Sequence, residues 1–185
     1  MPFEFIKTSV DNVYIIRPKV FEDNRGYFME TFEKRSFSNL DFNVIQENQS
    51  YSRKGVLRGL HFQKGKFAQA KIVRVIKGEI FDVAVDIRPD SKTFKKYVSA
   101  ILSDKNKEML YIPRGFAHGF EVLSDEAIVV YLVDNFYSPE NEGGIIWNDK
   151  DINIDWPIKE PILSKKDSSW PTLKQFLENE RSEKR

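Results

Sequence analysis

Short runs of β-branched and aromatic residues, separated by clusters of Gly, Pro, Asp and Ser, most strongly constrain the fold of this sequence. Ala127–Val133 is an unbroken apolar run rich in Ile and Val, which predicts a buried strand. Glu108–Ile112 and Gly119–Leu123 are shorter runs of the same kind, and turn residues such as Pro113-Arg-Gly115 separate them. Many short strands at this spacing, with few helical signals between them, predict an all-β sandwich or jelly-roll barrel.

One pair of strands carries charged residues on an apolar face. Lys71–Ile87 predicts a hairpin, because two β runs meet at Lys77-Gly78, a pair suited to a two-residue turn. With that turn, Lys71 lies opposite Ala84 and diagonal to Asp82. A Lys and an Asp on such a face are expected to pair with each other, as a structural contact, or with a ligand.

Helical signals are few. Lys34–Leu40 predicts a short helix, and Pro171–Glu180 predicts a C-terminal helix with Pro171 near its first turn. Glu178–Arg185 is a mixed-charge tail that we expect to fray. Since the 185 residues contain no repeat and no linker, we expect one jelly-roll domain spanning residues 1–185.

Composition argues against several classes of function. The chain has no Cys, which removes disulfides, thiolate catalysis and cysteine metal sites. Its net charge of +1 argues against long nucleic acids and anionic membranes as partners, although a local basic pocket for a small anion stays possible. The longest apolar run, Ala127–Val133, is too short to cross a bilayer, and the N-terminus lacks the apolar core of a signal peptide. We therefore expect a cytoplasmic protein.

The histidines and the absent motifs limit the chemistry. The two histidines, His61 and His118, lie far apart in the sequence and no His-x-His occurs, so the spacing does not support a metal site. Gly-rich phosphate loops and the Gly-x-Ser-x-Gly nucleophile motif are missing too. Acid–base chemistry remains, with His as base, Tyr as acid, and Lys or Arg near developing negative charge.

The segment Leu57–Gln63 places an arginine and a histidine among apolar neighbours. Strict alternation sends Arg58 to the face opposite His61, so the two enter one pocket only if a bulge at Gly59 turns the strand. A partly buried histidine is also commonly a hydrogen-bonded structural group, and the pattern alone gives both interpretations similar weight.

His118 and Tyr131 form a second conditional pair. An even-length loop between their strands, such as Ser124-Asp125, puts both side chains on one face, whereas a three-residue loop separates them. A tyrosine in a β-branched strand is by default a core residue with its hydroxyl at the rim, so this signal is weak alone.

Six motifs occur in order along the chain. They are DNRGYFME at 23–30, GVLRGLHFQ at 55–63, GEIFDVAVDIR at 78–88, IPRGFAHGF at 112–120, YSPE at 137–140 and IIWND at 145–149. Together they closely resemble the dTDP-4-dehydrorhamnose 3,5-epimerase family of the cupin superfamily. Order and spacing hold from about Val20 to Asp167, and several motifs in register are far more specific than one.

The resemblance implies a cupin-type jelly roll, a homodimer, and catalysis without a metal or organic cofactor. The implied substrate is dTDP-4-dehydro-6-deoxy-D-glucose, inverted at C3 and C5 to dTDP-4-dehydro-L-rhamnose in dTDP-L-rhamnose biosynthesis. By motif, His61 resembles the general base and Tyr131 the acid that reprotonates from the opposite face. Asp167 resembles the carboxylate that orients the histidine, and Lys71 the group facing the C4 oxygen.

Further residues are predicted to contact the substrate, most of them by the same resemblance. They are Arg25, Phe28, Glu30, Gln46, Asn48, Arg58, Asp82, His118, Tyr137, Glu142 and Lys166. Departures from the family pattern are mild: Phe136 stands where members often carry a second tyrosine, and Gly143 where a basic residue is common. Two alternatives stay open, a single-centre epimerase or ketoisomerase acting on a related nucleotide-linked ketosugar, and a sugar-nucleotide-binding cupin without catalysis.

Overall fold

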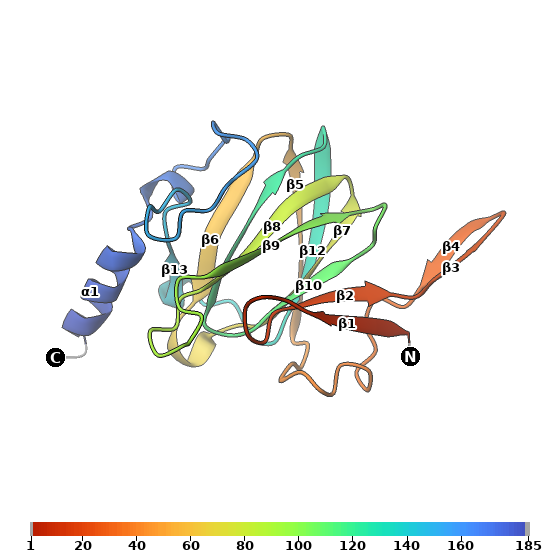
Figure 1. The fold of residues 1–185 in the computed structure, drawn as a ribbon, viewed down its shortest axis with the longest axis horizontal. Helices are drawn as coiled ribbons and strands as arrows, with labels where there is room; N and C mark the ends of the chain where they lie inside the picture. Colours follow the sequence, from red (N-terminus) through yellow and green to blue (C-terminus); the bar gives the residue numbers. More distant parts are fainter. Residues whose placement is uncertain (1, 184–185) are drawn as a thin grey trace.

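Two antiparallel sheets pack face to face in the computed structural model, which describes residues 2–183 and confirms the predicted all-β jelly roll (Figure 1). The six-stranded sheet has the order β1 (Phe3–Lys7), β2 (Tyr14–Pro18), β10 (Met109–Ile112), β7 (Lys71–Lys77), β12 (Glu126–Val133) and β5 (Gln46–Arg53). The five-stranded sheet has the order β13 (Glu142–Gly144), β6 (Leu57–Gln63), β11 (Phe116–Val122), β8 (Glu79–Asp86) and β9 (Tyr97–Ser103). A separate hairpin of β3 (Val20–Asp23) and β4 (Gly26–Met29) projects from this body.

Strand alternation places one set of apolar side chains between the sheets. Val73 and Val75 from β7 share this central cluster with Ile80 and Ala84 from β8. The outer face of the five-stranded sheet buries a second apolar cluster. The C-terminal segment, residues 145–183, contributes Ile152, Trp156 and Leu173 to it. Both faces of this sheet are therefore covered, which explains why β8 and β11 are buried along almost their whole length.

The predicted hairpin over Lys71–Ile87 is wrong. β7 pairs with β10 and β12, whereas β8 pairs with β11 and β9, so the chain crosses from one sheet to the other at Gly78. Gly78 has φ +85°, and a Cβ there would lie 2.0 Å from the carbonyl oxygen of Glu126. Alternation selects the same inward residues for a hairpin and for this crossing, so Lys71 and Asp82 still face one interior, but from opposite sheets.

The same correction applies to the strands of His118 and Tyr131. β11 and β12 belong to different sheets rather than to one hairpin. His118 follows the inward alternation of Phe116 and Phe120, and Tyr131 packs against the same central cluster from the other sheet. Both side chains therefore belong to the interior. The loop-length argument had left this open, and it assumed a pairing of the two strands that the structure does not have.

The strand β6 has a bulge at Gly59, which is the condition for Arg58 and His61 to share one face. In the β6–β11 ladder, Arg58 pairs with Phe120 and His61 pairs with His118, so two residues of β6 oppose Gly119 alone. Because the extra residue reverses the alternation, Arg58 and His61 both lie on the inner face of the sheet.

Helices are sparse, as predicted, but one prediction fails. Lys34–Leu40 forms consecutive turns, in which the Glu33 carboxylate accepts hydrogen bonds from the backbone N–H groups of Arg35 and Ser36. Short 3-10 helices occur at η1 (Gly65–Phe67), η2 (Pro139–Asn141) and η3 (Asp167–Ser169). No helix within residues 2–183 is long and apolar enough to span a membrane.

The predicted C-terminal helix is α1 (Leu173–Glu183), which begins two residues beyond Pro171. Thr172 caps it, because its Oγ1 accepts the N–H of Gln175 at 3.3 Å while Gln175 Oε1 accepts the N–H of Thr172 at 2.9 Å. The expected fraying of Glu178–Arg185 falls partly on residues 184–185, which lie outside the described residues.

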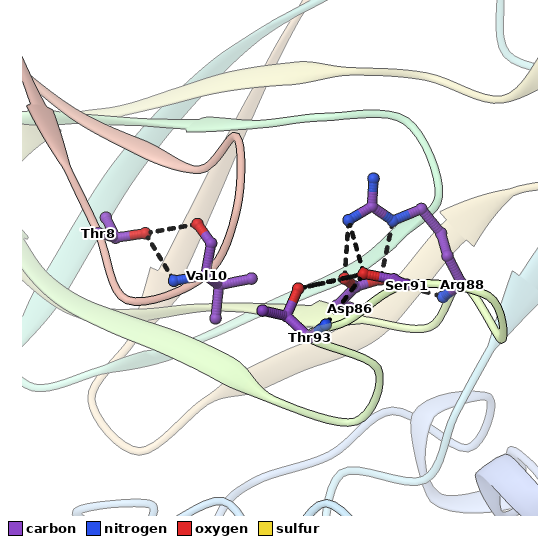
Figure 2. A network of polar contacts seen from close by, with 6 residues as sticks. All are labelled: Thr8, Val10, Asp86, Arg88, Ser91 and Thr93. Carbon is purple, nitrogen blue, oxygen red and sulfur yellow. Dashed lines mark hydrogen bonds and ion pairs between the residues drawn. The ribbon is translucent and has the colours of Figure 1, made fainter.

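A network of polar side chains lies at the C-terminal end of β8 (Figure 2). The buried Asp86 carboxylate accepts hydrogen bonds from the Arg88 guanidinium and from the hydroxyls of Ser91 and Thr93, at 2.5–2.8 Å. Burial acts to raise the pKa of Asp86, but these hydrogen bonds outweigh it and lower the pKa to about 2. The Arg88 guanidinium also lies 4.6 Å from the ring centroid of Phe116, at the start of β11.

Gly59→Ala is expected to lower the free energy of unfolding by roughly 2–4 kcal/mol. Gly59 has φ +122°, and a Cβ there would lie 2.6 Å from Cα of Gly119. Gly65→Ala is the matched control, because its φ is +56° with nothing within 4 Å of the added Cβ, so it should cost only about 1 kcal/mol. Equal midpoints in urea denaturation for the two variants would contradict the role of the close approach.

Candidate active site

A cavity of about 290 Å³ lies between the two sheets, and seven of the fifteen predicted site residues line it. It is lined by Gln46, Asn48, His61, Phe62, Gln63, Gln69, Lys71, Tyr131, Tyr137 and Glu142. Phe62, Gln63 and Gln69 were not predicted. Gln63 has the same parity as His61 on β6, so alternation offered a signal for it, whereas Gln69 lies outside any strand and had none.

His61 is held by a carboxylate from the far end of the chain. Its Nε2 forms a short hydrogen bond with Oδ1 of Asp167 in η3, and the other oxygen of Asp167 accepts the hydroxyl of Ser164 at 2.7 Å. The backbone N–H of Asp167 also donates to Ser164 Oγ at 3.0 Å, which fixes the turn. Burial acts to raise the pKa of Asp167, but the hydrogen bonds from His61 and Ser164 lower it overall. Asp167 is therefore an ionised partner for the histidine at neutral pH.

Lys71 enters the same cavity from β7 of the opposite sheet. Burial lowers the pKa of Lys71 to about 8, against the opposing charges of Asp82 and Glu142. Asp82 is itself fully buried and bonds Nε2 of His118 at 2.7 Å. Burial lowers the pKa of His118 despite this carboxylate, so the neutral ring donates to Asp82 near pH 7.

Tyr131 and Arg58 complete the inner part of the site. Burial raises the pKa of Tyr131, with Arg58 opposing the shift, so the phenol stays protonated at neutral pH. The Arg58 guanidinium is held by Ser52 Oγ at 2.9 Å and by the carbonyl oxygen of Tyr51 at 3.0 Å. Because Tyr131 and His61 belong to opposite sheets, they face the cavity from opposite sides.

The rim of the cavity is a hydrogen-bonded group of predicted contacts. Oε2 of Glu142 accepts the hydroxyl of Tyr137 at 2.7 Å and the ammonium of Lys166 at 2.5 Å. Gln46 donates to Oδ1 of Asn48 at 2.7 Å, and its own Oε1 accepts the N–H of Tyr137 at 3.4 Å. These five side chains come from three separate stretches of sequence and form one edge of the site.

Three predicted contacts do not reach the cavity of the same chain. Arg25, Phe28 and Glu30 lie on or next to the projecting β3–β4 hairpin, and all three are exposed (Figure 1). The guanidinium of Arg25 pairs with Asp23 of its own turn at 2.6 Å, and Phe28 is 66% exposed.

The site geometry supports proton transfer on opposite faces of one substrate. A carboxylate-bound histidine can remove a proton, a protonated tyrosine across the cavity can supply one, and a lysine can stabilise negative charge between them. Within residues 2–183, no three His, Asp or Glu side chains are grouped so as to hold a metal. The arrangement therefore suits acid–base chemistry on one ligand bound between the two sheets of a jelly roll.

Residues 7–175 match the family model described as dTDP-4-dehydrorhamnose 3,5-epimerase, so the chain belongs to that family. A relative of that description from Shigella flexneri is 55% identical over 165 residues, covering 88% of this chain and 91% of the relative. The crystal structure of dTDP-4-dehydrorhamnose 3,5-epimerase from Elizabethkingia anophelis superposes with a TM-score of 0.90 at 49% identity, covering 95% of this chain and 98% of that one.

A second crystal structure contains a bound sugar nucleotide. The Legionella pneumophila epimerase, in complex with dTDP-4-keto-L-rhamnose, has a TM-score of 0.90 and 44% identity to this chain, with 93% of each chain covered. The family membership that the resemblance of its motifs predicted is therefore confirmed.

Proposed function

We propose that this chain inverts C3 and C5 of dTDP-4-dehydro-6-deoxy-D-glucose with His61 as the base and Tyr131 as the acid. One observation carries the assignment: the Asp167-bound histidine and the partly buried, protonated tyrosine face one cavity from opposite sheets. Inversion requires the proton to leave one face of the carbon and return to the other. Two distinct groups on opposite sides meet that requirement, which a single acid–base residue does not.

The C4 ketone of the substrate explains why one site serves two carbons. A ketone acidifies the hydrogens on both neighbouring carbons, so removing either proton gives an enolate with its charge on the C4 oxygen. With Nε2 bound to Asp167, Nδ1 of His61 is the ring nitrogen available to take the proton. Asp167 orients the ring and stabilises the imidazolium that forms.

Lys71 is proposed to stabilise the enolate. It lies on β7 at the cavity, and its pKa of about 8 leaves it mostly charged at neutral pH. An ammonium group stabilises a developing oxyanion more strongly in a partly dry cavity than in water, because the lower dielectric constant strengthens their attraction. A partly buried lysine with this pKa can also share its proton more readily than an ordinary lysine.

The remaining predicted contacts are proposed to bind the nucleotide and the sugar. Arg58, whose guanidinium is already oriented by Ser52, is placed for an anionic or carbonyl oxygen. Tyr137 lies at the rim, half-exposed, where an aromatic ring can stack on the base.

We further propose that two chains form a homodimer in which each β3–β4 hairpin reaches the partner's cavity. Arg25, Phe28 and Glu30 are predicted ligand contacts, yet they lie on or next to an exposed hairpin and do not line their own cavity. A second copy is the simplest way to bring them to a ligand. The exposed aromatic side chains of Phe21, Tyr27 and Phe28 on this hairpin support an interface there.

Deuterium exchange from D2O into dTDP-4-dehydro-6-deoxy-glucose, followed by NMR against an enzyme-free control, tests the proposed function. The wild-type chain should exchange at both C3 and C5, and His61→Ala should abolish exchange while dTDP still binds. Tyr131→Phe should still exchange at C5 but form much less inverted product. Exchange at one carbon alone would instead identify a single-centre relative, and binding without exchange would identify a silent cupin.

The alkaline limb of the pH profile should report Lys71. Because the charged form stabilises the enolate, kcat/KM of the wild-type chain should fall as pH rises through about 8, the pKa of this group. Lys71→Arg keeps its charge to well above pH 10, so the fall should move to higher pH although the maximum rate is lower. An alkaline limb at the same pH in both proteins would show that another group titrates there.

Subunit complementation tests the proposed hairpin exchange. Arg25→Ala and His61→Ala should each be strongly impaired as pure proteins. If the hairpin crosses, a mixed dimer holds one site with both changes and one intact site, so refolding the two variants together should restore roughly a quarter of wild-type sites. Each variant refolded alone is the control. No recovery, or a monomer by light scattering, would contradict the proposal.

A further inference from the structure

Trp170 packs against the proposed base from outside the cavity. It follows η3, three residues after Asp167, and its indole ring lies 6.2 Å from the imidazole of His61, centroid to centroid, at an interplanar angle of 68°. This edge-to-face arrangement restricts rotation of the smaller ring. His61 is therefore fixed from two directions, by the Asp167 carboxylate and by the indole.

The neighbouring strand leaves space for this indole. Gly144 of β13 pairs with His61 of β6, and a Cβ at Gly144 would lie 2.2 Å from two carbons of the Trp170 ring. The indole thus rests directly on the backbone of the strand beside the base. A methyl group at residue 144 would have to displace the ring.

Trp170 is not held in place by a hydrogen bond from its indole N–H. Its indole N–H is buried, and within residues 2–183 it has no hydrogen-bond partner. A buried indole N–H ordinarily finds one, because leaving it unpaired costs free energy. What the residue contributes is its aromatic surface, which also lies under the ammonium of Lys166 at 5.5 Å.

The indole that packs on His61 also borders a second cavity. That cavity, of about 460 Å³, lies at the start of α1, and Trp170 forms part of its wall together with polar residues such as Lys150 and Asp151. Removing the indole would leave space beside His61 on the side of this polar cavity, into which water can enter. Water reaching the hydrogen bond between His61 and Asp167 would weaken it, since a hydrogen bond between charged groups is stronger in a dry environment.

We infer that Trp170 is a positioning residue, whose indole holds His61 and Asp167 in the geometry needed for proton removal. This inference rests on the proposed function of His61. Trp170 acts through the histidine rather than on the substrate, so its loss should slow the proton-transfer step and leave sugar-nucleotide binding nearly unchanged.

Steady-state kinetics of Trp170→Ala and Trp170→Phe give the first test. Trp170→Ala should lower kcat about tenfold or more, with KM changed less than about threefold, because only the reacting geometry is lost. Trp170→Phe keeps a ring against His61 and should retain most of kcat. A Trp170→Ala chain that folds, by its thermal unfolding, and keeps its kcat would overturn the inference.

Gly144→Ala supplies the second test, because it moves the indole without removing it. Alone it should lower kcat as Trp170→Ala does. In a double-mutant cycle, the effects of Gly144→Ala and Trp170→Ala on kcat should be non-additive. Once the indole is absent, the methyl group at residue 144 has no ring to displace. Gly144→Ala/Trp170→Phe should recover activity relative to Gly144→Ala, since the smaller ring leaves room for the methyl group. This recovery of activity tests the positioning role of Trp170 even if the Trp170→Ala variant does not fold.

Two results would show that Trp170 is only a packing residue. One is additive losses of kcat for Gly144→Ala and Trp170→Ala, and the other is a Gly144→Ala/Trp170→Phe variant no more active than Gly144→Ala. Failure of the proposed function looks different, because the wild-type chain would then show no exchange of the sugar's hydrogens. An active wild-type enzyme indifferent to the indole would overturn the positioning role alone.

Discussion

The close approach of the β6 and β11 backbones at Gly59 and Gly119 is the constraint on which the site depends. Without the bulge that it permits, alternation would send Arg58 and His61 to opposite faces of β6. With it, one strand delivers both to the interior, while its other face packs under the C-terminal segment. Because that segment carries Asp167, the histidine and its carboxylate both depend on a single irregularity in one strand.

Much of the fold follows from strand alternation, but the pairing of strands does not. Alternation correctly selects the inward residues of β7 and β8, including Lys71 and Asp82, because the side-chain period is the same in any sheet. Whether the chain turns back at Gly78 or crosses to the other sheet is decided by contacts far away in sequence. The N–H of Gly78 donates to Asp104, and its backbone lies against Glu126, neither of which a local pattern reveals.

The candidate site shows the same division. Gln63 and His61 share a parity, so local pattern suffices to group them. The bond between His61 and Asp167 joins residues 106 positions apart, and no spacing rule predicts it. The pairing of His61 with Asp167 was predicted from the resemblance of whole motifs, because strand periodicity carries no information on contacts this far apart in the sequence. Resemblance in turn names Arg25 as a ligand contact, but it says nothing of which chain's cavity the residue serves.

The two glycines of β13 carry a consequence for sequence variation. A Cβ at Gly143 would lie 2.5 Å from the ring of Phe62, just as one at Gly144 would meet Trp170. Each glycine and its ring therefore share one volume, which either residue can fill but not both. Across related sequences, positions 143 and 62 should co-vary, as should 144 and 170, with a larger residue on the strand accompanied by a smaller one opposite. The edge of this sheet thus evolves in pairs of positions rather than one residue at a time.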